Sequence, residues 1–306
     1  MTKDEIFKKT IEQKNKNRSL EILESQEYLK SCYYNQDILN LSNELGSLKI
    51  KIAECKLNGQ NCDDLKEEKK AKMTKFLYAL KSNNKDVNKI LPNFKCKKCD
   101  DKGYLENGNV CECLMNDFKI DLVKEIGINV DSTPTLDEID FRKSDNKEEL
   151  YKITNLLQKI YDSKYNTVLF TGATGTGKTY IAKSFLKTMA QNLKLCRFYS
   201  SFELNRQFCQ AHRNEKLFNS LMDELLESDI VVIDDLGSES SYNNITAENF
   251  LNLLNERQSQ NKITLFTTNL TLNDIKTKYT ERFFSRLMDK EISLKFNFIG
   301  KDLRLS

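Results

Sequence analysis

The chain is poor in tryptophan, proline and histidine. Its 306 residues include no Trp, two Pro and one His. Because proline interrupts helices, a chain of this length with so few prolines is expected to hold long helices and few proline-rich linkers. The sequence also has no run that approaches about 18 apolar residues, so no membrane span is expected.

The N-terminal segment MTKDEIFKKTIEQKNK has no apolar core of the kind found in secretory signals. Nine cysteines would suit the disulfide framework of a secreted protein, but four of them cluster at metal-ligand spacing. A reducing, cytoplasmic location is therefore the better interpretation.

Charge is abundant but nearly balanced. Charged residues make up 30% of the chain and hydrophobic residues 39%, which suits a soluble protein with a modest core and a length of about two domains. The net charge of +3 is too small to indicate nucleic-acid binding by itself, although it permits a local basic face.

The N-terminal region, residues 1–90, has a helical pattern. Apolar side chains recur at alternating spacings of four and three residues, at Tyr34, Ile38, Leu41, Leu45, Leu48, Ile52 and Cys55. This spacing is typical of the seam of a coiled coil or a helical hairpin.

A break and a second helix follow. Asn58-Gly59-Gln60-Asn61 interrupts the pattern, as Gly and Asn do at helix ends. Further apolar positions follow at Leu65, Phe76, Leu77 and Leu80. An antiparallel helical hairpin is expected, either as a partner-binding region or as an intramolecular bundle.

From about residue 150 the pattern changes to short apolar runs that alternate with helical stretches. The runs are Thr167–Phe170, Leu195–Tyr199, Ile230–Ile233, Ile263–Phe266 and Ile292–Phe296. Such alternation predicts an α/β domain with a parallel sheet between helices. We therefore expect a helical region over 1–90, a cysteine module over 91–120, a linker over 121–150 and an α/β domain over 151–306.

A glycine-rich loop follows the first of these runs. It matches G-x-x-x-x-G-K-[ST] and consists of Gly172, Ala173, Thr174, Gly175, Thr176, Gly177, Lys178 and Thr179. The loop follows an expected strand and opens an expected helix, which is the context of a phosphate loop. Backbone N–H groups would surround the phosphates of ATP, Lys178 would contact the β and γ phosphates, and Thr179 would ligate Mg²⁺.

Two carboxylates follow the third apolar run. Asp234 lies at the expected strand's C-terminal end, where ligands of parallel sheets bind, and is expected to hold Mg²⁺ directly or through water. Asp235 is predicted to orient or deprotonate the attacking water, the alternative being a cap for the next turn.

Two further motifs complete the predicted site. In ITLFTTNL, Asn269 would hydrogen-bond the attacking water beside the γ phosphate, although an Asn after a strand is commonly a turn residue. In TERFFSRLMD, Arg282 and Arg286 lie four residues apart on one helix face. They are either a solvated face or the source of an arginine that enters a neighbouring subunit's ATP site.

Four cysteines form two close pairs, Cys96-x₂-Cys99 and Cys111-x-Cys113. Four thiolates are a preferred ligand set for structural Zn²⁺, and a full set leaves no open position for catalysis. Free thiols and an iron–sulfur cluster are the alternatives. Zinc binding would provide the folding energy of this short segment.

In this order, the phosphate loop, IVVIDD, FTTNL and RFFSR resemble an AAA+ ATPase of the initiator and helicase-loader branch. The paired aspartates, the ending FNFIGKDLR and the cysteine pairs narrow the resemblance to the bacterial DnaC/DnaI-type replicative helicase loaders, which are similar to the IstB-like transposition ATPases. The resemblance covers about residues 92–306, and residues 1–90 match only in being helical.

The resemblance implies roles for individual residues. They are Walker A for Gly172 to Thr179, Walker B for Asp234 and Asp235, sensor 1 for Asn269, a trans-acting finger for Arg286 and sensor 2 for Arg304. Many relatives have Glu as the second Walker B acid, which leaves the rate of hydrolysis open. The resemblance also implies that the N-terminal region binds a DnaB-type helicase hexamer. The AAA+ domain would then bind ATP, single-stranded DNA and neighbouring copies, which would stimulate a weak ATPase.

The same branch carries an extra helix that contacts DNA between the second strand and Walker B. Candidate phosphate contacts in and near this segment are Lys194, Arg197, Arg206 and Arg213, although each is individually more typical of a solvated side chain. His212 is expected on a helix surface, and Cys196 and Cys209 in the core.

Three other functions are compatible with parts of this sequence. The first is an IstB-like transposition helper that binds duplex DNA and a transposase. The second is a helical adaptor that holds ATP as a structural ligand, which Asp235 and Arg286 argue against. The third is a small-molecule kinase, for which the sequence offers no acceptor site or lid.

Overall fold

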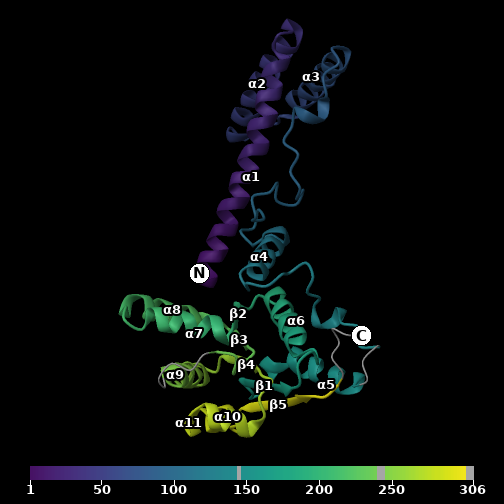
Figure 1. Ribbon diagram of the computed structural model, residues 1–306. Coiled ribbons are helices and arrows are strands. Elements are labelled where there is room, and N and C mark those ends of the chain that lie inside the picture. The colour runs from purple at the N-terminus through teal and green to yellow at the C-terminus, as the bar shows by residue number, and fades with distance from the viewer. Residues whose placement is uncertain (143–145, 240–244, 301–306) are drawn as a thin grey trace. The chain divides into compact units, whose positions relative to one another are not determined.

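The computed structural model describes residues 1–142, 146–239 and 245–300 (Figure 1). The chain divides into two compact units, Ile11–Leu114 and Met1–Thr10 together with Met115–Ser306. Each unit has hydrophobic clusters of its own. The expected division into 1–90, 91–120, 121–150 and 151–306 stays a prediction.

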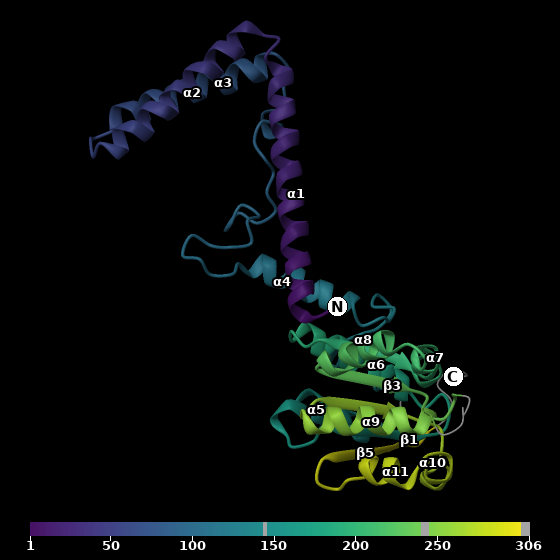
Figure 2. The ribbon, with the colours of Figure 1, turned by 90° about the vertical axis from the view of Figure 1, so that its left-hand side faces the viewer.

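The smaller unit is mainly helical. Its elements are most of α1 (Lys3–Cys32), α2 (Gln36–Leu57), α3 (Asp63–Ser82) and the short helix η1 (Val87–Lys89). α2 and α3 lie side by side (Figure 2), and the expected break at residues 58–61 separates them. The predicted helical hairpin is confirmed.

The predicted seam forms the core of this hairpin, with one exception. Ile38 and Leu45 of α2 are buried against Phe76 and Leu80 of α3. Tyr34 is 97% exposed, so its assignment to the seam was wrong. α1 ends at Cys32. The Asn35 side chain accepts hydrogen bonds from the N–H groups of Asp37 and Ile38 and so caps the start of α2, which leaves Tyr34 between the two helices.

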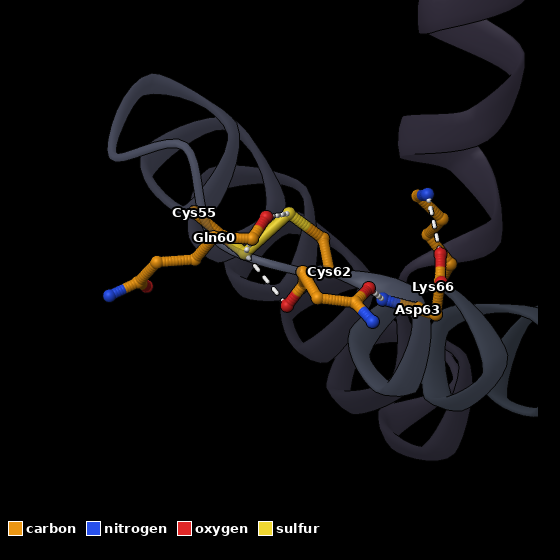
Figure 3. Close-up of a disulfide and its surroundings, with 6 residues drawn as sticks. Cys55, Gln60, Cys62, Asp63 and Lys66 are labelled. Carbon is orange, nitrogen blue, oxygen red and sulfur yellow. Dashed lines mark hydrogen bonds and ion pairs between the residues drawn. A yellow bond between two sulfur atoms is a disulfide. The ribbon is translucent and has the colours of Figure 1, made fainter.

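A disulfide closes the turn between α2 and α3. Cys55 and Cys62 are bonded, with their Cα atoms 6.1 Å apart, a separation usual for such bridges (Figure 3). Beside it, Lys66 Nζ donates to Asp63 Oδ1 at 2.8 Å and holds the pKa of that carboxyl below its usual range. The sequence interpretation favoured reduced cysteines and is wrong for this pair.

The larger unit is built on a five-stranded parallel sheet of order β2-β3-β4-β1-β5. The strands are β1 (Thr167–Gly172), β2 (Cys196–Ser200), β3 (Ile230–Asp234), β4 (Ile263–Thr267) and β5 (Ser293–Phe298). The predicted α/β class with a parallel sheet between helices is confirmed, since each expected apolar run overlaps a strand.

Helices pack on both faces of the sheet (Figure 1). The helices that lie wholly or mostly in this unit are α4 (Glu112–Lys124), η2 (Leu136–Glu138), α5 (Lys147–Gln158), η3 (Ile160–Asp162), α6 (Lys178–Gln191), α7 (Ser201–Ala211), α8 (Glu215–Glu227), α9 (Ile245–Ser259), α10 (Leu272–Lys278) and α11 (Glu281–Leu287). Alternate residues of β1 point to opposite faces of the sheet. Val168 and Phe170 join the cluster with α5 and α6, whereas Leu169 joins the cluster with α7 to α11.

A buried arginine connects the N-terminal ends of β3 and β4. Arg257 of α9 has no exposed surface and donates to the carbonyls of Ser228 and Ile263 and to Thr264 Oγ1. Burial lowers the pKa of Arg257 to about 9. Its bonds satisfy the buried guanidinium and fix the starts of the strands whose far ends carry the site.

Among the helices in the described ranges, none combines the length and apolar content that a membrane span requires.

Candidate functional site

The phosphate loop connects β1 to α6 at the carboxyl edge of the sheet. Gly172, Gly175 and Gly177 all have positive φ, at 140°, 76° and 92°. A Cβ on Gly172 would lie 2.2 Å from the Phe298 carbonyl oxygen, so another residue would not fit there. The turn therefore depends on glycine, and it delivers the chain into the N-terminus of α6, a site suited to anions.

Lys178 is the first residue of α6, and its ammonium is held over the loop. Lys178 Nζ donates to the carbonyls of Gly172 and Ala173, each at 2.7 Å, and to Asn269 Oδ1 at 2.9 Å. The side chain is 6% exposed. The positive charge is thus concentrated in the loop where phosphates would bind.

Asp234, at the end of β3, faces the phosphate loop. Its Oδ1 accepts from Thr179 Oγ1 at 2.8 Å and from Thr267 Oγ1 at 2.6 Å. A hydroxyl and a carboxylate in contact are the protein ligands that Mg²⁺ takes in phosphate-loop proteins. The residues present therefore fit a magnesium ion.

Asp235 has an unusual backbone. Its φ is +56°, which is uncommon outside glycine, and its N–H donates to Thr267 Oγ1 at 2.9 Å. Asn269 Nδ2 donates to Asp235 Oδ1 at 2.8 Å. Asn269 therefore contacts both Lys178 and Asp235, which is where a residue that orients water beside a γ phosphate would lie.

Sequence reasoning missed Thr267. Its hydroxyl bonds Asp234 and the backbone of Asp235, so it fixes both acids from the neighbouring strand. The signal was present in FTTNL, because Thr267 ends β4 two residues before Asn269. Its contact with the acids depends on β3 and β4 being adjacent, which the sequence does not state.

Two of the three arginines predicted to act in the site lie on α11. Arg282 and Arg286 are both exposed on α11, whose buried side chains are Phe283 and Leu287. The helix is thus packed on one side and presents its arginines to solvent. Arg304 lies outside the described residues.

The candidate DNA contacts need one correction. Arg197 is 5% exposed and donates to the carbonyl of Glu125 and to its carboxylate at 3.1 Å, so it is not a phosphate contact. Arg206 and Arg213 are exposed, and Lys194 is partly exposed, with its Nζ 3.9 Å from the centre of the Tyr161 ring.

His212 is exposed at the end of α7, as expected. Cys196 is buried, but Cys209 is only partly buried.

The four clustered cysteines come together in the smaller unit. The sulfurs of Cys96, Cys99, Cys111 and Cys113 all lie within 4.8 Å of one another, with the Cys96–Cys111 pair at 3.7 Å and the Cys99–Cys113 pair at 3.4 Å. Tetrahedral Zn–S bonds place sulfurs about 3.8 Å apart, so the cluster fits zinc.

The backbone around the cluster is tightly turned. Cys111 N donates to the Gly103 carbonyl at 2.8 Å, and Tyr104 pairs with Val110 as an antiparallel bridge. Hydrogen bonds from backbone N–H groups lower the pKa of the Cys96 thiol to about 7, whereas burial raises the pKa values of Cys99 and Cys113. Two thiols of the cluster are thus costly to ionise unless a cation compensates them.

Comparison with known proteins agrees with the ATP-site geometry. The model of the IstB-like ATP binding protein family matches residues 128–290, just over half of the chain. No curated protein sequence matches the chain significantly.

Solved structures give only distant likenesses. A DnaI structure is 18% identical over 55% of this chain and 89% of its own, with a TM-score of 0.44. The DnaC helicase loader is 21% identical over 53% and 96%, with a TM-score of 0.45. AMPPCP-bound DnaA from Aquifex aeolicus is 16% identical over 54% and 50%, also at 0.45. At these values the three structures assign no function.

The family match carries the assignment. It spans β1 to α11, and so includes the phosphate loop, both Walker B aspartates, Asn269 and Arg286. Together with the contacts among these residues, it supports ATPase activity. The chain belongs to the IstB-like ATP binding protein family.

Proposed function

We propose that this protein is an ATP-dependent loader of the replicative helicase. The observation that carries the proposal is the combination of two units in one chain, a phosphate-loop ATPase and a separate helical hairpin with a cysteine cluster. The hairpin unit binds a DnaB-type helicase hexamer in the cytoplasm. The ATPase unit binds ATP, single-stranded DNA and further copies of the chain.

ATP binding rests on the loop and its two neighbouring strands. The N–H groups at the start of α6 would donate to phosphate oxygens, and Lys178 would exchange its bonds to the loop carbonyls for bonds to phosphate oxygens. Thr179 and Asp234 would hold Mg²⁺, which would neutralise charge on the phosphates.

Hydrolysis uses the acids and amide already in contact. Asp235 accepts a proton from, or orients, the attacking water, while Asn269 fixes the Asp235 carboxylate. Arg286 is exposed and therefore available to the ATP site of a neighbouring copy. We assign no position to Arg304 and retain its sensor 2 role as a prediction.

The cysteine cluster has a structural role in this proposal. Cys96, Cys99, Cys111 and Cys113 would hold Zn²⁺, and the metal would fix the local fold of the 96–113 segment. The segment is too short to fold on a core of its own.

A transposition helper is the second candidate, and the family match favours it. Such a protein would bind duplex DNA and a transposase. The two candidates share the ATP site, so they differ in what the hairpin unit binds.

The test is size-exclusion chromatography with light scattering, in which the full chain is mixed with the replicative helicase of the same cell. A stable complex in the presence of ATP is the expected result. Elution of both proteins at their separate masses, with and without ATP, would contradict the loader and favour the transposition helper.

A further inference from the structure

A buried acid, Glu239, lies just beyond the two partly buried aspartates Asp234 and Asp235. Glu239 is 3% exposed, and its carboxylate accepts hydrogen bonds from Ser201 Oγ, from Tyr279 OH and from Gly237 N at 2.9 Å. Lys278 Nζ lies 3.6 Å away as its ion-pair partner. A carboxylate removed from water is costly unless it is paired and hydrogen-bonded in this way, and nothing in the ATP site described above requires it.

The partners of Glu239 come from two helices and from the junction that follows the second of them. Ser201 begins α7, Lys278 ends α10, and Tyr279 lies in the junction between α10 and α11. Lys278 Nζ also donates to the carbonyls of Gly237 and Glu239. One side chain therefore attaches the segment after Asp235 to the start of α7 and to the start of the α11 region.

The same segment is attached to the ATP site on its other side. Leu236 N donates to the Thr267 carbonyl at 2.7 Å, and Thr268 Oγ1 donates to the Leu236 carbonyl at 2.6 Å. Gly237 has a φ of +106°, and a Cβ there would lie 2.5 Å from the Leu270 side chain. The chain from Asp235 to Glu239 is thus packed directly against the strand end that carries Asn269.

From Tyr279 the packing continues into α11. The rings of Tyr279 and Phe283 lie 5.0 Å apart, and Phe283 is fully buried with its ring 5.9 Å from that of Phe266 in β4. Arg286 follows on the same short helix with its side chain in solvent. Arg286 therefore lies on a helix that is connected, through Tyr279, to Glu239 and the segment after Asp235.

We propose that Glu239 is a positioning residue for the arginine finger. It fixes α11 relative to the Walker B segment, so that Arg286 is presented at the distance and angle that a neighbouring copy's ATP site requires. The inference rests on the proposed ATPase assembly and goes beyond it by assigning the residue that aligns donor and site.

Complementation between two inactive variants tests the positioning role of Glu239. K178A lacks a working phosphate loop but keeps Arg286, and R286A keeps the loop but lacks the finger. Mixed on single-stranded DNA, the pair should recover ATP turnover, because each R286A site can receive Arg286 from a K178A neighbour. Absence of recovery would refute the trans-acting finger itself, and the positioning role with it.

The informative mixtures place E239Q in one partner at a time. Gln keeps the shape of the side chain but loses the charge that Lys278 and Tyr279 contact. With K178A/E239Q as the finger donor, recovered turnover should fall at least tenfold. With E239Q in the R286A partner instead, turnover and ATP affinity should stay within about twofold of the R286A mixture.

A finger-positioning residue acts from the subunit that donates the finger. The proposal would therefore be overturned if turnover fell only when E239Q is in the R286A partner, or fell equally whichever partner carries E239Q. Y279F provides a second variant if E239Q does not fold, since it removes one hydrogen bond and keeps the ring packing on Phe283. It should reduce recovery in the same donor-specific direction, and a Y279F donor with full recovery would contradict the account.

Discussion

Lys178 Nζ donates to Asn269 Oδ1 at 2.9 Å, although the two residues are 91 positions apart in the chain. The contact exists because β1 and β4 are neighbours in the parallel sheet, so the phosphate loop and the end of β4 meet at one edge. Asn269 also donates to Asp235, and its amide therefore connects the Lys178 ammonium to the predicted catalytic acid.

Replacing Asn269 by Ala should slow hydrolysis far more than it weakens ATP binding. Removal of one well-placed polar group beside the reacting centre typically lowers kcat about 10²–10³-fold. The measurement is steady-state turnover together with calorimetric ATP binding. N273A, a change at an exposed Asn of α10, should leave both unaltered. Wild-type kcat in N269A would remove Asn269 from the mechanism.

Replacing Arg286 by Ala should spare ATP binding and abolish assembly-dependent turnover. Arginine fingers contribute roughly 10³–10⁵ in rate where they operate. The matched control is R282A, which removes an exposed arginine one helical turn earlier on α11. If R286A hydrolyses ATP at the wild-type rate on single-stranded DNA, or if R282A is equally impaired, Arg286 is not the finger.

Metal analysis of the purified protein should find one zinc per chain. C99S removes a buried ligand and should lose the metal and the protection of residues 96–113 from proteolysis. C209S, at a cysteine of α7 outside the cluster, should retain both. A metal-free protein in which this segment remains protected would contradict the zinc assignment.

Removing the disulfide should destabilise the α2–α3 hairpin. Cys55 and Cys62 are seven positions apart, and closing so short a loop stabilises the folded state by about 2.5 kcal/mol on the chain-entropy model. The paired change C55S/C62S should lower the denaturation midpoint of the hairpin by a corresponding amount. Alkylation of unreduced, unfolded protein should leave both cysteines unlabelled, and labelling of both would show that the bond does not form.

The parts predicted well from the sequence are those set by local pattern. β1, β3 and β4 are buried on both faces and appear as short, mostly apolar runs, and the phosphate loop needs glycine at fixed positions. The positions of Asp234 and Asn269 at this edge of the sheet were predicted because ligand-binding residues follow strand ends in parallel sheets.

The parts that were missed depend on contacts between distant segments. Thr267 resembles an ordinary strand residue until β4 lies beside β3, and Arg197 resembles a solvated arginine until Glu125 packs against it. Glu239 has partners that are up to 40 positions away. Tyr34 was misplaced because a heptad count does not register the Asn35 cap that restarts the helix.

The most direct test of the loader assignment is ATP turnover with single-stranded DNA compared with duplex DNA of the same length. The account predicts that single strands stimulate hydrolysis several-fold, that the stimulation weakens as salt rises, and that duplex DNA has little effect. Stimulation by duplex DNA, with none by single strands, would contradict the loader and identify the transposition helper as the better account.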